Sequence, residues 1–132
     1  MNDSNTILKT QVIIIGAGPT GLSMAVQLCR QNIDFIIIDK KEKTTTLSKA
    51  LAVQARTLEI FAELGIARRA ISEGRITTAL NLFYRGKRQA GINLSGLGEG
   101  LSPYPFALSL EQSKTEELLA DYLIAKRTTA RN

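Results

Sequence analysis

The chain has 132 residues, of which 44% are hydrophobic and 22% charged, and its formal net charge is +5. Such a composition is typical of one globular domain with a modest core. The sequence contains no histidine and a single cysteine, which excludes an internal disulfide and removes the usual metal ligand and general base. We therefore expect no metal site, and we name no catalytic acid, base or nucleophile.

The basic residues do not follow a nucleic-acid-binding pattern. They alternate with acids, as in Lys40–Lys43, and few aromatic residues lie among them. No apolar run reaches the roughly 18 residues of a membrane span, and the polar residues 1–10 lack the pattern of a signal peptide. These features predict a cytoplasmic protein with no nucleic acid partner, no membrane span and a disordered N-terminus over 1–10.

The strongest signal lies in residues 12–39, where a strand, a glycine-rich turn, a helix and a second strand follow one another. Val12–Ile15 is an apolar run typical of a buried strand, and it leads into Gly-Ala-Gly-Pro-Thr-Gly at 16–21. A helical apolar pattern continues through Cys29, and a second run, Phe35–Ile38, ends in an acid. This order predicts a Rossmann-like βαβ unit with a dinucleotide-binding fingerprint.

Each residue type in the turn suits a task at a nucleotide. Gly16 allows the tight turn, Gly18 leaves room for a pyrophosphate at the backbone, and Gly21 lets the helix approach the strand. Pro19 and Thr20 begin the helix, whose N-terminal N–H groups attract phosphates.

The acid after the second strand, Asp39, is expected to accept hydrogen bonds from ribose hydroxyls and to repel a 2′-phosphate. Lys40 follows it as a further candidate cofactor-binding residue. The alternative is a turn whose glycines serve packing alone. That alternative accounts for Gly21, but not for three glycines at this spacing together with the acid.

The rest of the chain adds shorter elements. They are, in chain order, a polar loop over 40–48, helices over 53–64 and 67–73, a hairpin with strands 79–85 and 89–94 around Gly86-Lys87, a loop over 95–105, a strand over 106–110, a helix over 113–126 and an unstructured tail over 127–132. The predicted class is α/β, with an incomplete parallel sheet and an antiparallel hairpin. Because no third long apolar strand is evident, one sheet edge should stay open and favour self-association.

Three segments together resemble the N-terminal part of the flavoprotein aromatic-ring hydroxylases. These are the single-component FAD monooxygenases of the p-hydroxybenzoate and phenol hydroxylase type. The glycine turn alone is shared by many dinucleotide folds, and the two later segments narrow the resemblance. The segments are Gly16–Gly21 with Asp39, the stretch Ser48–Glu59, and Gln112 with Glu116.

The resemblance implies an FAD/NAD(P)-binding fold over residues 11–126, forming the N-terminal part of an FAD-binding domain. It implies FAD as cofactor, NAD(P)H as a transient electron donor, and hydroxylation of a small phenol-like aromatic substrate with O2. It also implies two further cofactor-binding residues, Lys49 near the phosphate and ribityl region and Gln112 near the ribose and ribityl chain. Arg56 matches a basic position of the family, and a structural role for it is equally expected.

Two later segments of the family, an Asp-Gly segment and a Gly-Asp segment, have no counterpart in this sequence. The chain is therefore expected to be a piece of such an enzyme, inactive by itself. Two alternatives stay open: the N-terminal part of another FAD-dependent oxidoreductase, and a non-catalytic truncated remnant that binds nucleotide weakly or not at all.

Overall fold

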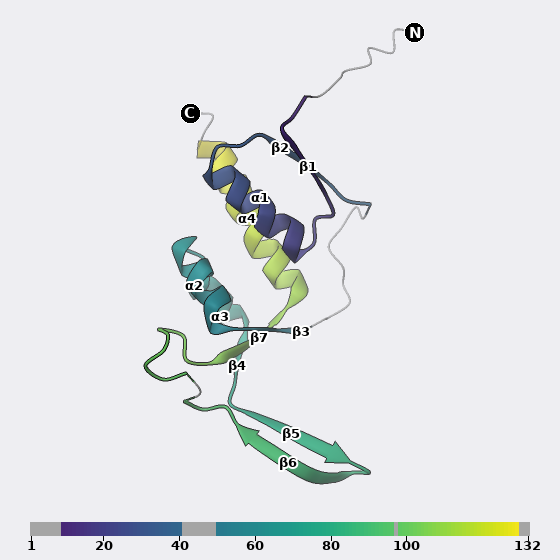
Figure 1. The fold of residues 1–132 in the computed structure, drawn as a ribbon, viewed down its shortest axis with the longest axis vertical. Helices are drawn as coiled ribbons and strands as arrows, with labels where there is room; N and C mark the ends of the chain where they lie inside the picture. Colours follow the sequence, from purple (N-terminus) through teal and green to yellow (C-terminus); the bar gives the residue numbers. More distant parts are fainter. Residues whose placement is uncertain (1–8, 41–49, 97, 130–132) are drawn as a thin grey trace. The chain divides into compact units, whose positions relative to one another are not determined.

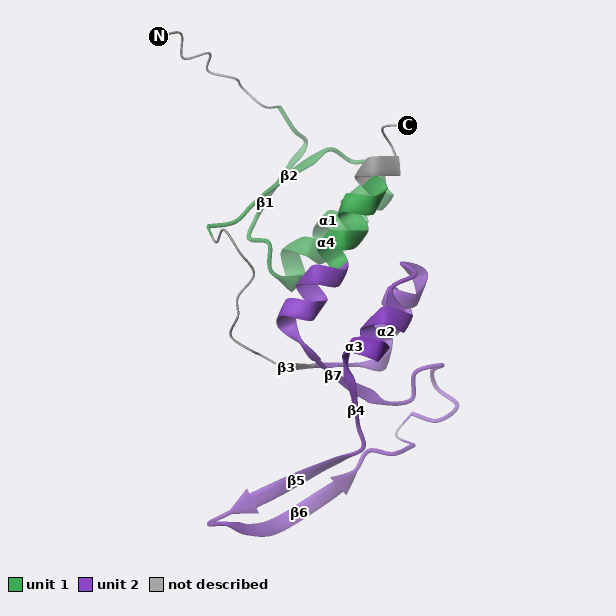
Figure 2. Ribbon diagram, turned by 180° about the vertical axis from the view of Figure 1, so that it is seen from behind, with its two compact units in different colours: residues 1–44, 119–132 green, residues 45–118 purple. Residues whose placement is uncertain are grey.

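The computed structural model describes residues 9–40, 50–96 and 98–129. These residues form two compact units, one made of residues 1–44 and 119–132 and the other of residues 45–118 (Figure 2). The last helix, α4 (Gln112–Thr129), contributes its first turns to the second unit and the remainder to the first. None of the described helices is long and apolar enough to cross a membrane.

The first unit contains the predicted βαβ arrangement, which is thereby confirmed. Strands β1 (Val12–Ile15) and β2 (Phe35–Ile38) pair in parallel with Ile15 opposite Ile38. Helix α1 (Pro19–Arg30) connects them and contacts both (Figure 1). A parallel pair needs such a crossover connection, so the glycine turn and the helix follow directly from the strand order.

The apolar stripe of α1 and one face of β1 form the small core of this unit. Leu22, Ala25 and Val26 are buried on the helix, and Ile14 is 9% exposed on the strand. Side chains alternate along a strand, and accordingly Ile13 and Ile15 on the other face are 61% and 86% exposed. Among the described residues the parallel sheet has two strands, which agrees with the predicted lack of a third.

The second unit is built on a three-stranded antiparallel sheet in the order β3-β7-β4, with two short helices. The elements are β3 (Ala50–Val53), α2 (Ala55–Glu63), α3 (Ala67–Glu73), β4 (Arg75–Thr77) and β7 (Ala107–Glu111). Helix α2 ends at Glu63 with Leu64 as its C-cap, and Gly65 follows with a φ of +76°. The N–H of Ile66 bonds back to the carbonyl of Phe61 at 2.8 Å. Gly65 thus provides the positive φ that commonly terminates a helix.

A separate hairpin lies within this unit, formed by β5 (Ala79–Tyr84) and β6 (Lys87–Asn93) (Figure 1). Every residue of both strands is exposed. The turn is Arg85-Gly86, one residue earlier than predicted. Both turn residues have positive φ, +48° and +74°, as a two-residue turn between twisted strands requires.

Other boundaries also differ from the sequence prediction. The helix predicted to start at Val53 begins at Ala55, because residues 50–53 form β3, which was not predicted. Strand β4 was not predicted either. Both pair with β7, thirty or more residues away in sequence, so a local pattern did not reveal them. Helix α4 continues to Thr129, beyond the predicted end at Lys126.

Candidate functional site

The three glycines of the turn have different structural environments. Gly16 has a φ of +107°, a conformation that other residues adopt with strain. At position 21 a Cβ would overlap the carbonyl oxygen of Gly16 and come within 3.2 Å of the Cγ2 of Ile14. These two glycines are therefore required by the turn and by the close approach of α1 to β1.

Gly18 differs from both, because nothing within the described chain requires a glycine there. Its φ and ψ are −75° and −178°, an extended conformation open to any residue. A Cβ at this position would meet no atom within 4 Å. The backbone of residue 18 therefore borders open space at the N-terminus of α1.

This helix terminus has the properties of an anion site. Gly18 is the N-cap residue and provides no side-chain hydrogen bond to the helix, and Pro19 follows as its first residue. The first turn contains no acidic residue. The N–H groups of Thr20 and Gly21 belong to that first turn, where an α-helix provides no internal acceptor. Together with the positive end of the helix dipole, these donors favour a phosphate or another anion.

The side chain of Asp39 is hydrogen-bonded to the same turn. Its Oδ2 accepts a hydrogen bond from the backbone N–H of Ala17 at 2.6 Å. The neighbouring N–H, that of Gly16, bonds to the carbonyl of Ile38 at 2.7 Å. The end of β2 and the start of the glycine turn are thus held together by two short hydrogen bonds, one of them charge-assisted.

A pocket of about 710 Å³ lies at the carboxyl ends of the two parallel strands. In open parallel sheets, this edge is where ligands bind. Three of its lining residues were predicted from the sequence, namely Gly16, Asp39 and Lys40. The other two, Ile15 and Ile38, were missed, although each is the last residue of its strand. The structure therefore brings a carboxylate, an ammonium group and two apolar side chains to one pocket.

Of the three predicted residues later in the chain, the structure describes Gln112 and Arg56. Lys49 lies outside the described residues. Gln112 is the first residue of α4 in the second unit, half-buried, and its Nε2 donates to Glu116 Oε1 at 2.8 Å. Arg56 pairs with Glu59 on the same helix at 2.9 Å, which favours the structural alternative for this residue.

Glu59 also connects α2 to the loop before β7. Its Oε1 accepts a hydrogen bond from the hydroxyl of Ser102 at 2.8 Å, and the N–H of Tyr104 donates to that hydroxyl at 3.1 Å. The hydrogen bonds from Arg56 and Ser102 lower the pKa of Glu59. The hydrogen bond with Glu59 in turn raises the pKa of Arg56. The Glu59 carboxylate thus joins α2 to the loop before β7 through a hydrogen bond.

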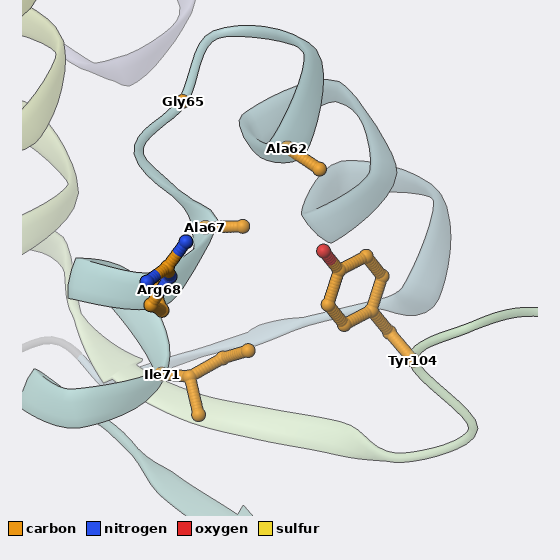
Figure 3. Close-up of a pocket in the computed structure, with 6 residues that line it drawn as sticks. All are labelled: Ala62, Gly65, Ala67, Arg68, Ile71 and Tyr104. Carbon is orange, nitrogen blue, oxygen red and sulfur yellow. The ribbon is translucent and has the colours of Figure 1, made fainter.

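A second, smaller pocket of about 220 Å³ lies beside this contact between α2 and the loop. Tyr104 reaches from the loop toward Ala62 on α2, and Arg68 and Ile71 on α3 lie across from it (Figure 3). None of its lining residues was predicted to bind cofactor. They are Ala62, Gly65, Ala67, Arg68, Ile71 and Tyr104.

Comparison with known protein families gives one match over nearly the whole chain. The family described as FAD binding domain matches residues 9–131. The chain is 37% identical over 113 residues to the 6-methylpretetramide 4-monooxygenase of Streptomyces rimosus, covering 86% of this chain and 20% of that protein. It is 32% identical over 109 residues to the pentachlorophenol 4-monooxygenase of Sphingobium chlorophenolicum, covering 82% of this chain and 20% of that protein.

A solved structure agrees with these matches. The flavin-dependent monooxygenase PieE, in complex with FAD and substrate, is similar with a TM-score of 0.76 at 26% identity. The match covers 90% of this chain and 22% of that one. The chain thus spans about a fifth of the length of the relatives that it matches.

Proposed function

The chain belongs to the FAD binding domain family, and from this premise we propose that it forms the adenosine-binding part of a flavin-dependent monooxygenase. The proposed enzyme hydroxylates a phenol-like aromatic compound with NAD(P)H and O2. The relatives named above support this reaction class, since both are named as monooxygenases and one of them as acting on pentachlorophenol, a phenol.

The observation that carries the proposal is the environment of Gly18. Two of the three turn glycines are required by the fold itself, one by its positive φ and one by its contact with Gly16. Gly18 has neither requirement, and it borders open space at an uncapped helix N-terminus. A pyrophosphate that approaches the backbone at this point explains the missing side chain, whereas packing does not.

The chain's residues fit the ADP half of FAD. The N–H groups at the start of α1 would bind the pyrophosphate. Asp39 would accept hydrogen bonds from the ribose hydroxyls, while its bond to Ala17 keeps the carboxylate oriented at the pocket. Lys40 adds positive charge at the pocket, and Ile15 and Ile38 provide apolar walls against which an adenine ring would pack.

The family resemblance implies two further cofactor-binding residues, Lys49 and Gln112. Lys49 would approach the phosphate and ribityl region as a point charge rather than as a bidentate group. Gln112 would bind near the ribose and the ribityl chain. When bound, FAD supplies the redox and oxygen chemistry, and the protein's part is binding, orientation and exclusion of water. NAD(P)H would bind transiently as the electron donor.

The proposal is tested by titrating FAD against residues 1–132 and then displacing it with ADP, following flavin fluorescence. FAD binding that ADP abolishes competitively is the expected result, because the proposed contacts are mainly to the ADP half. FAD binding that ADP does not displace, or no binding by a folded chain, would contradict the proposal. Gly18→Val is the matched variant, and it should remove the binding of both ligands.

A further inference from the structure

Near the N-terminal end of α4, a buried carboxylate is hydrogen-bonded to a side-chain amide. Glu116 is 6% exposed, and its Oε1 accepts a hydrogen bond from Gln112 Nε2 at 2.8 Å. Residues four apart on a helix lie on one face, so helix geometry brings the two side chains together. Gln112 itself is half-buried and lies at the start of the helix.

This contact fixes the orientation of the Gln112 amide relative to Glu116. A carboxylate accepts hydrogen bonds and donates none, so a buried carboxylate requires a donor beside it. Of the two ends of an amide, only the nitrogen donates. The nitrogen of Gln112 must therefore face Glu116, and the carbonyl oxygen, Oε1, points away from Glu116.

The polarity of Gln112 decides which ligand groups it can bind. The Oε1 that points away from Glu116 is a hydrogen-bond acceptor, so it pairs with a hydroxyl or an N–H group. It does not pair with a phosphate oxygen, which is itself an acceptor. Of the parts of FAD near the proposed Gln112 position, the ribose and the ribityl chain carry hydroxyl donors and the pyrophosphate carries none.

We propose that Glu116 is a positioning residue that orients the Gln112 amide so that its carbonyl oxygen binds a ribityl hydroxyl of FAD. This rests on the proposed function, because Gln112 is a cofactor-binding residue only within it. ADP has no ribityl chain, so Glu116 affects the affinity for FAD and leaves the affinity for ADP unchanged. The residues of the glycine turn affect both.

A neighbouring residue provides the matched control. Thr115 is 7% exposed, and its hydroxyl has no hydrogen-bond partner among the described residues. Thr115→Val removes this hydroxyl next to Glu116 and leaves the Gln112–Glu116 pair in place. Since the hydroxyl is buried without a described partner, its removal should not lower stability.

The experiment measures the dissociation constants of the full 132-residue chain for FAD and for ADP by calorimetry. Glu116→Gln should weaken FAD binding by about twofold to tenfold, the range of one neutral hydrogen bond, because an amide in place of the carboxylate no longer dictates the orientation of Gln112. ADP affinity should stay at the wild-type value. Thr115→Val should change neither constant.

A double variant that exchanges the two side chains extends the test. It keeps the proposal testable if Glu116→Gln folds poorly. The double variant Gln112→Glu with Glu116→Gln exchanges the two side chains, so that the amide now donates from the fifth helical position to a carboxylate at the first. The exchanged carboxylate again presents an oxygen acceptor at the start of the helix, and FAD affinity relative to ADP should recover.

Two results would overturn this role of Glu116. The proposal is wrong if Glu116→Gln and the double variant both keep the wild-type ratio of FAD affinity to ADP affinity. It is also wrong if they weaken the binding of both ligands equally. A wild-type chain that binds neither ligand would overturn the proposed function, and with it the role of Glu116.

Discussion

The carboxylate of Asp39 accepts a hydrogen bond from the backbone N–H of Ala17 at 2.6 Å, across twenty-two residues of sequence. The bond connects the end of the second strand to the middle of the glycine turn. It places the acid beside the N-terminus of α1, at the pocket that Gly16 and Lys40 also line. One carboxylate therefore both stabilises the turn and lies where a ribose would bind, since a carboxylate has acceptor sites for more than one donor.

The position of Asp39 predicts discrimination against a 2′-phosphate. ADP-ribose should bind the chain at least about tenfold more tightly than 2′-phospho-ADP-ribose, because the phosphate would lie against a like charge and lose the hydroxyl donor. Asp39→Asn should narrow this preference, and Lys40→Ala should widen it, since Lys40 attracts the phosphate. Competition titrations measure both ratios. Equal affinity of the wild-type chain for the two ligands would count against the ribose role of Asp39.

Substitutions at two glycines of the turn should have different effects, one on ADP binding and the other on stability. Gly18→Val should keep the free energy of unfolding within about 1 kcal/mol, the scale of an N-cap effect, and should abolish ADP binding. Gly21→Ala should lower the free energy of unfolding by about 1–3 kcal/mol or more, because the new Cβ overlaps the carbonyl of Gly16. Thermal unfolding and calorimetry on both variants measure the two effects. Near-wild-type ADP affinity in Gly18→Val would show that the turn serves packing alone.

Glu59 should stabilise the second unit near neutral pH and lose this effect in acid. Its pKa is lowered by hydrogen bonds from Arg56 and Ser102. Stabilisation of this sign is fully present above the unfolded-state pKa of about 4.3, and it is lost as the pH falls through the folded-state pKa. Glu59→Gln should therefore lower the melting temperature between pH 5 and 7, and the difference from wild type should shrink below pH 4. Glu111→Gln, at an exposed strand position, is the control. A difference between Glu59→Gln and wild type that stays constant down to pH 3 would contradict this account.

The hairpin should promote self-association of the isolated chain. Leu80, Leu82 and Ile92 are 55%, 65% and 60% exposed, and Leu80 is paired with Ile92 on one face. Both outer edges of this two-stranded sheet have no strand partner among the described residues, and such edges favour association. The double variant Leu80→Thr with Leu82→Thr should shift the chain toward monomer in sedimentation velocity. Ala79→Thr, on the opposite face, should not, and an equal effect of both changes would argue against this surface.

Local patterns were sufficient for the βαβ unit, because its strands, turn and helix are consecutive and each has its own residue signature. Gly16, Gly18 and Asp39 could be placed for the same reason. The antiparallel sheet could not be predicted, since β3 and β4 are short and exist through pairing with β7, which is distant in sequence. The apolar pocket walls at Ile15 and Ile38 were missed because both residues read as ordinary core positions of buried strands.

The central claim is that the glycine turn and Asp39 bind the ADP half of a flavin nucleotide. Calorimetric titration of ADP against the wild-type chain, Asp39→Ala and Asp34→Ala tests it most directly, because Asp34 precedes the same strand at its opposite end. Losing a charge-assisted hydrogen bond costs about 1.5–3 kcal/mol. We therefore predict that Asp39→Ala weakens ADP binding about tenfold to a hundredfold, while Asp34→Ala matches wild type. Equal dissociation constants for all three proteins would contradict the claim.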